Sequence, residues 1–425
     1  MHFDTLQKWL AWQENFHPVT IDLGLDRAEQ VYRALNHDGI KPLTITVAGT
    51  NGKGSCVAYL EAMFCAQGYR VAAYTSPHIL KYNERIKING VPVSDEMICN
   101  AFVRIESVRD GLSLSYFEFG TLAALDIFWR EQVDIQLLEV GLGGRLDAVN
   151  IVDPDIAVIS SIGIDHTYWL GDTREAIGRE KAGIFRAAIP AIVGDPEPPA
   201  SVIATASEKQ ARLYQINRDF GYQKTGADWC WHTDGCVLEH LPEPALKGEH
   251  QFRNAAAAIL AVQLINSRLP VSTDAIRYGL AHVKLNGRFQ LLPGDATVLL
   301  DVGHNPQAVT TLAEHLRLYY PDKKIHAVFS MMKDKDIAGV LAIMKPVVEH
   351  WYFAPLVNPR AASESLMREI FLQTAIANVS FGFNNFTEAF HQAKSRINHD
   401  GLLVVFGSFF LISDCLTEFE KGELT

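Results

Sequence analysis

A chain of 425 residues is long enough for two or three domains. Hydrophobic residues make up 48% of it and charged residues 20%, which is typical of a globular protein and excludes long disorder. The formal net charge is -11 and no block of basic residues occurs, which argues against a nucleic-acid partner because such binding depends on clustered Lys and Arg.

Neither the cysteines nor the apolar segments predict a secreted or membrane protein. The six cysteines are scattered without a C-x-x-C spacing, so they indicate no zinc site and no disulfide framework. Met1 to Asp4 show no basic segment before an apolar core, and no signal peptide is expected. Leu402 to Ile412 are too few to span a bilayer and predict a buried strand with its exit loop. We therefore expect a cytoplasmic protein, with a monomer as the default state and no membrane partner.

An amphipathic helix is predicted at the N-terminus, over residues 4–14. Leu6, Trp9 and Leu10 recur there at helical spacing. A second helix is expected over residues 28–35.

A strand, a tight loop and a helix are predicted next. The apolar run 43–48 breaks into a loop with three glycines, and a helix-compatible segment follows over 56–66. Backbone N–H groups of such a loop and the helix N-terminus together form a cavity for phosphate oxygens. The loop reads Gly49-Thr50-Asn51-Gly52-Lys53-Gly54-Ser55.

This loop is a shortened variant of the Walker pattern, which has four residues between its first glycine and its Gly-Lys pair. Two residues separate Gly49 from Gly52, and Gly54 separates Lys53 from Ser55. Lys53 is expected to contact the β- and γ-phosphates of a nucleotide, and Ser55 to supply a hydroxyl. A glycine-rich turn without a ligand is the alternative.

Polar residues follow three predicted strands, at the positions where open α/β sheets bind ligands. Ser76 follows the strand 69–74, Glu139 ends the strand 133–140, and His166 follows the strand 156–161. Glu139 occupies the position after a P-loop that holds Mg²⁺. We predict that these three side chains converge, against the alternatives of a solvated glutamate and a structural histidine. Lys181 is predicted, from spacing alone, to lie on a helix face.

The remainder predicts a small β-rich insertion and then a second α/β domain. The insertion covers residues 195–250, and helices follow from Asn254 and over 272–282. Strands and helices then alternate from residue 297 to 406, including a helix over 337–349. The predicted fold class is α/β. A P-loop ATPase domain with a mostly parallel sheet covers residues 1–287, and a smaller Rossmann-like α/β domain covers 288–425.

Two stretches, Gly49 to Ser55 and Leu137 to Asp147, resemble the signature stretches of the folylpolyglutamate synthase family, within the Mur ligase superfamily. The resemblance extends over nearly the whole chain. It includes Ser76-Pro77-His78, Tyr116-Phe117-Glu118-Phe119-Gly120, Asp165-His166-Thr167, Glu180-Lys181-Ala182-Gly183, Gly287-Arg288-Phe289 and Asp301-Val302-Gly303-His304-Asn305-Pro306. It implies a Mur ligase-like fold.

The resemblance implies ATP-dependent amide formation. A substrate carboxylate takes the γ-phosphoryl group to give an acyl phosphate, the amine of L-glutamate attacks it, and phosphate leaves. The carboxylates implied are those of dihydropteroate, which becomes dihydrofolate, and of the glutamate tail of tetrahydrofolates. Most of the protein's task is then positioning and charge neutralisation.

The same resemblance implies a role for individual residues. ATP is to be bound by Gly52, Lys53, Gly54, Ser55, Asn254, Arg288, Asp301 and His304. One Mg²⁺ is to be held by Ser76, Glu139 and His166, and a second by a carbamylated Lys181, because carbamylation turns a cation into an anion. The pterin substrate is to contact Thr20, Ile21, Asp22, Leu23, Tyr116, Phe117, Glu118 and Arg145. The catalytic residues implied are Lys53, His166 and Lys181.

Other functions stay open at this point. Tail extension of tetrahydrofolates could be the sole activity. A Mur cell-wall ligase needs a further domain before the loop, and the 48 residues that precede Gly49 are taken up by two helices and a strand. A P-loop phosphotransferase or an ATP-binding regulatory module is a candidate of another class. Phosphate release that requires both a pteroate and glutamate distinguishes these alternatives.

Overall fold

The computed structural model describes residues 3–19, 21–37, 39–226, 228–293, 297–397, 401–422 and 424. They form two compact units. The first contains the chain up to Gly163, then Tyr168–Ala245 and Phe252–Lys284, and the second contains Ile164–Thr167, Leu246–Gln251 and the chain from Leu285 onward. No helix among the described residues is both long enough and apolar enough to cross a membrane.

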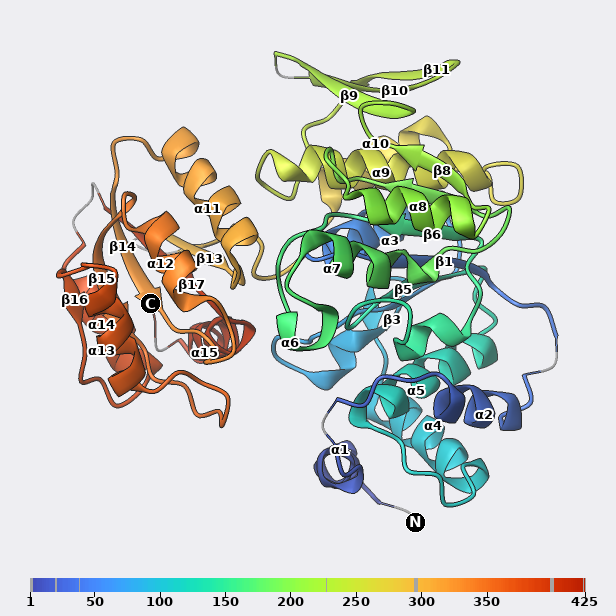
Figure 1. Cartoon of the computed structure of the whole chain (residues 1–425), viewed down its shortest axis with the longest axis horizontal. Coiled ribbons are helices and arrows are strands. Elements are labelled where there is room, and N and C mark those ends of the chain that lie inside the picture. Colours follow the sequence, from blue (N-terminus) through green and yellow to red (C-terminus); the bar gives the residue numbers. More distant parts are fainter. Residues whose placement is uncertain are drawn as a thin grey trace. The chain divides into compact units, whose positions relative to one another are not determined.

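The first unit is built on an eight-stranded sheet of order β4-β3-β2-β5-β1-β6-β7-β8 (Figure 1). From β2 to β8 neighbouring strands run parallel, whereas β3 and β4 pair antiparallel. Every residue of β1 is buried, as expected for a central parallel strand with helices on both faces. The strands are β1 Leu43–Ala48, β2 Val71–Tyr74, β3 Ile86–Ile88, β4 Val91–Pro92, β5 Ile135–Glu139, β6 Ile156–Ile159, β7 Pro190–Val193 and β8 Arg212–Gln215.

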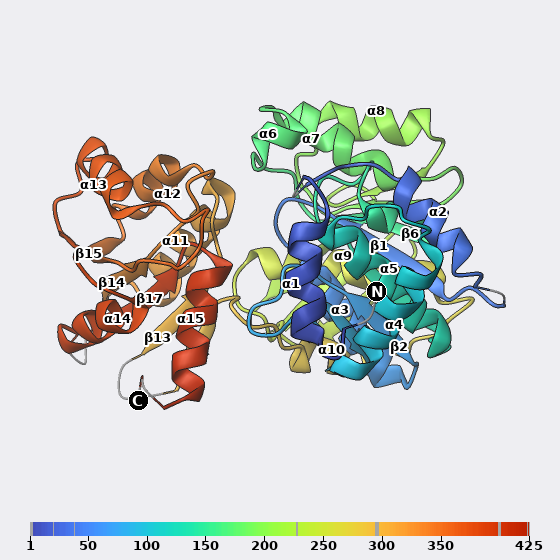
Figure 2. The same ribbon diagram turned by 90° about the horizontal axis from the view of Figure 1, so that it is seen from below.

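Helices α1, α4 and α5 pack against one another beside this sheet (Figure 2). Helix α3 packs against α10 and also contacts β1, β2 and β5. The helices that precede residue 285 are α1 Leu6–Phe16, α2 Asp26–Ala34, α3 Lys53–Gln67, α4 Asp95–Val108, α5 Tyr116–Arg130, α6 Thr167–Leu170, α7 Arg174–Lys181, α8 Ala200–Glu208, α9 His250–Ile265 and α10 Thr273–His282. Short 3₁₀ turns are η1 Tyr82–Arg85, η2 Ala148–Ile151 and η3 Ala182–Ile184.

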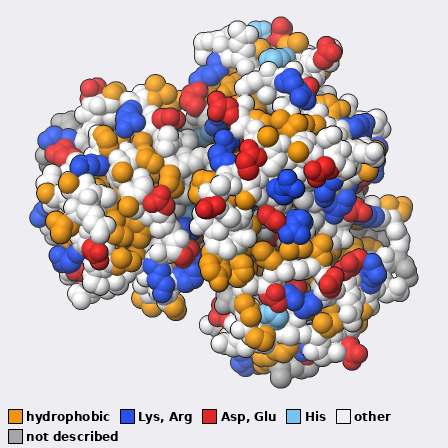
Figure 3. Space-filling model, viewed as in Figure 1, with side chains coloured by type: hydrophobic (Ala, Val, Ile, Leu, Met, Phe, Trp, Pro, Cys, Tyr) orange, Lys and Arg blue, Asp and Glu red, His pale blue; other side chains and the backbone are white. Residues whose placement is uncertain are grey.

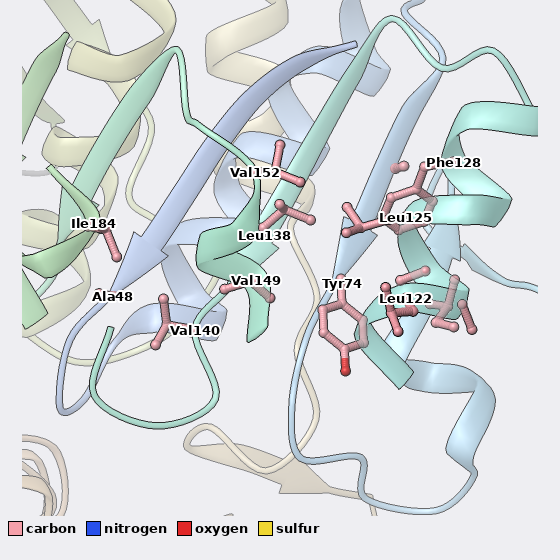
Figure 4. Packing of buried hydrophobic residues seen from close by; sticks show 14 of the residues in the cluster. Ala48, Tyr74, Leu122, Leu125, Phe128, Leu138, Val140, Val149, Val152 and Ile184 are labelled. Atoms are coloured by element: carbon pink, nitrogen blue, oxygen red, sulfur yellow. The ribbon is translucent and has the colours of Figure 1, made fainter. Parts of the chain in front are cut away.

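Helix α5 carries much of the core of the first unit. Leu122, Leu125 and Phe128 point from α5 toward the sheet, where Tyr74 of β2 and Leu138 of β5 lie (Figure 4). All five side chains are buried. Neither α4 nor α5 is predicted from the sequence. Because α5 is buried on most of its surface, it lacks the polar stripe that marks an amphipathic helix.

The β-rich insertion predicted over residues 195–250 is confirmed in part: a three-stranded antiparallel sheet of order β11-β10-β9 lies within it, whereas β8 joins the main sheet. Its strands are β9 Phe220–Thr225, β10 Asp228–Thr233 and β11 Cys236–Leu241. The buried indole of Trp231 donates its Nε1–H to the carbonyl of Ala256 in α9 at 3.1 Å, which fixes this small sheet to the first unit.

The second unit is built on a six-stranded sheet of order β12-β13-β17-β14-β15-β16, parallel except for β12. Phe329, Val404 and Leu312 are buried in its core. The strands are β12 Gln290–Leu292, β13 Val298–Asp301, β14 Lys324–Phe329, β15 Val348–Phe353, β16 Val379–Ser380 and β17 Gly401–Phe406. The helices are α11 Pro306–Tyr319, α12 Ile337–Met344, α13 Glu364–Gln373, α14 Phe386–Ser395 and α15 Phe409–Glu420.

Two predictions in this unit are wrong. The helix predicted over 337–349 ends at Met344, and Val348 already belongs to β15. Pro346 explains the early end, because proline disfavours a helical conformation in the residue before it. The exit loop predicted up to Ile412 is replaced by α15, whose N-cap Ser408 accepts a hydrogen bond from the Leu411 N–H at 3.0 Å.

Candidate active site

The glycine-rich loop joins β1 to α3 in a conformation that side chains would prevent. Gly49 has φ +148° and Gly52 has φ +87°. A Cβ on Gly49 would lie 2.0 Å from Ser160 Oγ. No side chain caps α3, and its first turn carries no acidic residue. The helix thus begins directly after a glycine-rich loop with no acidic residue in its first turn, and such a helix N-terminus is suited to binding phosphate.

The segment after β6 holds this loop in place. Thr50 Oγ1 donates to the carbonyl of Gly163 at 3.0 Å and accepts from its N–H at 2.9 Å. Ser160 Oγ donates to the Asn51 carbonyl at 2.6 Å, and Ser161 Oγ accepts from the Asn51 N–H at 3.2 Å. The loop is thus preorganised by bonds that involve none of its glycines.

Lys53 and Lys181 reach the same backbone atom. The Nζ atoms of Lys53 and Lys181 donate to the carbonyl oxygen of Gly49 at 3.2 Å and 2.9 Å. Lys181 is the last residue of α7, and it is 5% exposed rather than solvated on a helix face. Two lysine side chains thus converge on one backbone carbonyl beside the glycine-rich loop, where an anionic ligand would be attracted.

Ser76 and Glu139 lie together at the ends of the neighbouring strands β2 and β5. The Ser76 N–H donates to Glu139 Oε2 at 3.2 Å, and Glu139 is buried. Their oxygens suit Mg²⁺, which prefers carboxylate and other hard oxygen ligands. Among the described residues no group of three or more His, Cys, Asp or Glu is arranged for a metal. A Mg²⁺ ion here would therefore complete its shell with phosphate oxygens and water.

Asp147 closes the loop that follows Glu139. Its carboxylate accepts hydrogen bonds from the N–H groups of Leu142 at 2.8 Å and Val149 at 3.1 Å. Burial raises the pKa of Asp147 to about 6, although these bonds and the charge of Lys53 oppose the rise. Gly144, in the same loop, lies so close to α7 that a Cβ there would be 2.9 Å from the carbonyls of Glu180 and Lys181. The loop after β5 is thereby fixed against the end of α7 that carries Lys181.

The two segments expected to receive the pterin are linked by Arg27. Its guanidinium contacts Asp22 Oδ2 at 2.8 Å and donates through Nε to Glu118 Oε1 at 3.2 Å. The other oxygen of Glu118 accepts from the Ser115 N–H at 2.7 Å and caps α5. Ile21 and Leu23 flank Asp22 and are half-buried, whereas Thr20 lies outside the described residues.

The remaining predicted residues of the first unit border this region. The ring of Phe117 lies 2.5 Å from where a Cβ on Gly141 would be. Arg145 pairs with Glu180 at 2.9 Å and is half exposed. Asn254 is buried, and its Oδ1 would lie 2.7 Å from a Cβ on Gly52. Gly54 and Ser55 form the first turn of α3.

His166 and His304 flank a carboxylate in the second unit. The carboxylate of Asp165 accepts hydrogen bonds from Lys335 Nζ at 2.5 Å and from Asn305 Nδ2 at 3.1 Å. His304 Nε2 lies 3.5 Å from Asp165 Oδ2. Burial would raise the pKa of Asp165, but the hydrogen bond from His304 and the nearby positive charges hold it well below its usual range. The convergence of His166 with Ser76 and Glu139 stays a prediction.

Arg288 and Asp301 also lie in the second unit. The Arg288 guanidinium lies over the ring of Phe409, 5.2 Å from its centroid. Asp301 accepts from the N–H groups of Gly303 at 2.7 Å and Phe289 at 3.3 Å. Burial raises the pKa of Asp301 to about 6, although the charge of Arg288 opposes the rise.

Several residues of these networks carry no signal in the sequence. Lys335 lies in an alternating run of lysine and aspartate, which is typical of a solvated loop, and it is paired and largely buried with Asp165. Arg85 and His78 follow β2 and meet only through the fold, where Arg85 Nε donates to His78 Nδ1 at 2.9 Å. The Lys335–Asp165 pair could not be found from spacing, because 170 positions separate its members.

Comparisons with known proteins agree over the length of the chain. Residues 287–409 match the family of the Mur ligase, glutamate ligase domain. The chain is 43% identical over 408 residues to the dihydrofolate synthase/folylpolyglutamate synthase of Escherichia coli (strain K12), which covers 96% of this chain and 94% of that protein.

Solved structures show the same similarity. The structure of E. coli FolC in complex with DHPP and ADP matches with a TM-score of 0.93 at 42% identity, covering 99% of this chain and 98% of that one. A bifunctional folylpolyglutamate synthase/dihydrofolate synthase with Mn, AMPPNP and L-glutamate bound matches with a TM-score of 0.90 at 41% identity, covering 98% of each chain.

Proposed function

Because the chain belongs to the dihydrofolate synthase/folylpolyglutamate synthase family, we propose how its residues join L-glutamate to dihydropteroate and to the glutamate tail of tetrahydrofolates at the expense of ATP. The observation that carries the proposal is the convergence of Lys53 and Lys181 on the Gly49 carbonyl, at the N-terminus of α3. A phosphate chain is the kind of anionic group that two lysine side chains beside a helix N-terminus attract.

ATP is bound by the loop from Gly52 to Ser55, with its γ-phosphate beside Lys53. Asn254 lies against the loop from the side of α9, and Arg288, Asp301 and His304 are assigned to the nucleotide from the second unit. Ser76 and Glu139, together with His166, would hold Mg²⁺, which neutralises charge on the transferring phosphoryl group when it is bound.

The substrate carboxylate attacks the γ-phosphorus and ADP leaves, which produces an acyl phosphate. The amine of L-glutamate then attacks the carbonyl carbon, the C–O bond to phosphate breaks, and the amine loses a proton as the amide forms. Lys53 neutralises the negative charge that develops on the phosphoryl oxygens in the first step. Preorganisation of the loop by Ser160 and Thr50 means that little reorganisation is needed during transfer.

Lys181 acts as a carbamate in this proposal. Its amine is buried beside the loop, and the neutral amine adds CO₂ with loss of a proton to form the carbamate. Carbamylation replaces the repulsion between Lys181 and Lys53 with an attraction and supplies oxygens for a second Mg²⁺.

Phosphate release by the purified protein with MgATP and L-glutamate tests this function. The acceptor is dihydropteroate, tetrahydrofolate or neither, and the products are identified by mass. We expect glutamate-dependent release with both acceptors and addition of one glutamyl residue per phosphate. Release with tetrahydrofolate alone would restrict the enzyme to tail extension. A phosphorylated product that forms without glutamate would indicate a phosphotransferase instead.

Four further features stay predictions. The division into residues 1–287 and 288–425 agrees with the start of the second unit at Leu285, but that unit also contains Ile164–Thr167 and Leu246–Gln251. A cytoplasmic location and a monomeric state are expected from the sequence alone. Small molecules are the expected partners.

A further inference from the structure

A closed loop follows β2 and carries Arg85 next to the candidate site. The Thr75 N–H donates to the Arg85 carbonyl at 2.9 Å and closes the loop. The carboxylate of Glu84 accepts the three consecutive N–H groups of Ile79, Leu80 and Lys81 at 2.7 to 2.8 Å. These bonds give the loop a defined shape.

The guanidinium of Arg85 is held by one histidine and two tyrosine rings. Its Nε donates to His78 Nδ1 at 2.9 Å, and its Cζ lies 5.5 Å and 5.6 Å from the ring centroids of Tyr82 and Tyr116. The ring nitrogen of His78 accepts this hydrogen bond and so orients the planar guanidinium.

Arg85 differs from the other arginine that stacks on two rings. Arg109 lies over Trp12 and Phe16, but it donates to both carboxylate oxygens of Glu106 at 2.6 Å and 2.9 Å. For Arg85 the residues that the structure describes offer no carboxylate and no acceptor to the two terminal nitrogens. A planar fork held by stacking, with its outer N–H groups open, is suited to bidentate binding of a carboxylate.

The Arg85 loop lies at the same end of the sheet as the candidate active site. Arg85 lies over the ring of Tyr116, which is the first residue of α5. The next residue, Phe117, places its ring against Gly141 in the loop after β5. Ser76, in the same loop as Arg85, contacts Glu139. Arg85 therefore lies in the loop at the end of the sheet where the acceptor carboxylate is expected to react.

Dihydropteroate and tetrahydrofolate differ in whether they carry a second carboxylate. The one carboxylate of dihydropteroate is the group that reacts, whereas a folate with a glutamate tail carries further carboxylates that do not react. We propose that Arg85 binds a non-reacting carboxylate of the glutamate-bearing acceptor and so sets the preference between the two substrates. This inference rests on the function proposed above.

The test compares the wild type with Arg85→Gln and Arg85→Lys. We expect the ratio of kcat/KM for dihydropteroate over tetrahydrofolate to rise about 10- to 100-fold in Arg85→Gln, mainly through KM for tetrahydrofolate. Arg85→Lys keeps the charge without the fork, so an intermediate ratio is expected. The matched control is Lys87→Gln, which removes a cation two residues along the chain and should leave the ratio unchanged.

Binding is measured separately, by titration calorimetry of both acceptors with MgADP present. Weaker binding of tetrahydrofolate relative to dihydropteroate in Arg85→Gln supports the inference even if turnover fails, and failed turnover in the wild type would contradict the proposed function instead. Equal losses for both acceptors, or an unchanged ratio in Arg85→Gln, would overturn it. Arg85→Lys supplies the same comparison if Arg85→Gln does not fold.

Discussion

Lys53 and Lys181 differ in what the chain around them reveals. Lys53 stands among glycines after an apolar strand, so its loop is recognisable locally. Lys181 lies in an ordinary helical segment, and α7 must pack against the phosphate loop before its amine meets the Gly49 carbonyl. The same contact thus arises from one residue with a local signature and one without.

Replacing Lys53 removes the cation that faces the developing phosphate charge. We expect Lys53→Ala to lower kcat about 100- to 1000-fold. Phosphate release with saturating MgATP measures this change, and the exposed Lys324→Ala serves as the control. Near-normal turnover in Lys53→Ala would remove the loop lysine from the mechanism.

Replacing Lys181 tests the carbamate. Lys181→Ala should be inactive, and acetate or formate should restore part of the activity, because a small carboxylate can occupy the space of the missing carbamate. Lys53→Ala should not respond to the same additives. Full activity of Lys181→Ala without an additive would exclude the role.

At the scale of elements, helix α5 is joined to α4 through one buried carboxylate. Asp126 in α5 is fully buried, accepts from Arg104 of α4 and from Arg130, and has His37 Nε2 at 3.4 Å. Burial would raise the pKa of Asp126, but the hydrogen bonds from His37 and Arg104 and the arginine charges lower it. A depressed pKa means that the stabilisation is present above the unfolded value, near pH 4, and is lost as the pH falls through the folded value.

Asp126→Asn should therefore destabilise the first unit in a pH-dependent way. We expect the free energy of unfolding to fall by about 3 kcal/mol at pH 7, because one partner of a buried charge cluster is removed. The difference from the wild type should shrink as the pH falls below about 4. Urea unfolding at several pH values measures both effects. Arg130→Gln, at a half-exposed position, is the control and should cost less than about 1 kcal/mol.

At the scale of the whole molecule, charge is distributed rather than concentrated. Acidic and basic side chains are interspersed with apolar ones on the face drawn in Figure 3. The net charge of -11 therefore does not form a single strong patch on that face. Specific binding of an anionic nucleotide must then come from the local arrangement at the loop after β1.

Nucleotide binding should stabilise the whole chain by mass action. MgADP at 100 times its Kd should add about 2.7 kcal/mol to the stability of the unit that binds it, and the melting midpoint should rise by a few degrees. Thermal unfolding with and without MgADP measures the shift. Lys53→Ala should show a smaller shift at the same concentration, and an equal shift in both proteins would contradict the assigned phosphate contact.

The sequence by itself determined the features that depend on neighbouring residues. The alternation of strands and helices, the glycines of the loop and the polar residues after strands are local, because backbone conformation and periodicity act over a few residues. The same locality explains the errors: Pro346 ends α12 early, and Ser408 starts α15 where an apolar run predicts a loop.

Only the tertiary structure decided which distant residues meet. Lys181 reaches Gly49 across 132 positions, Arg27 contacts Glu118 across 91, and Lys335 pairs with Asp165 across 170. Helix α5 also depends on tertiary structure, because its apolar surface is buried only when α5 packs against α4 and the sheet. These contacts depend on how buried surfaces pack, and no spacing along the chain records that packing.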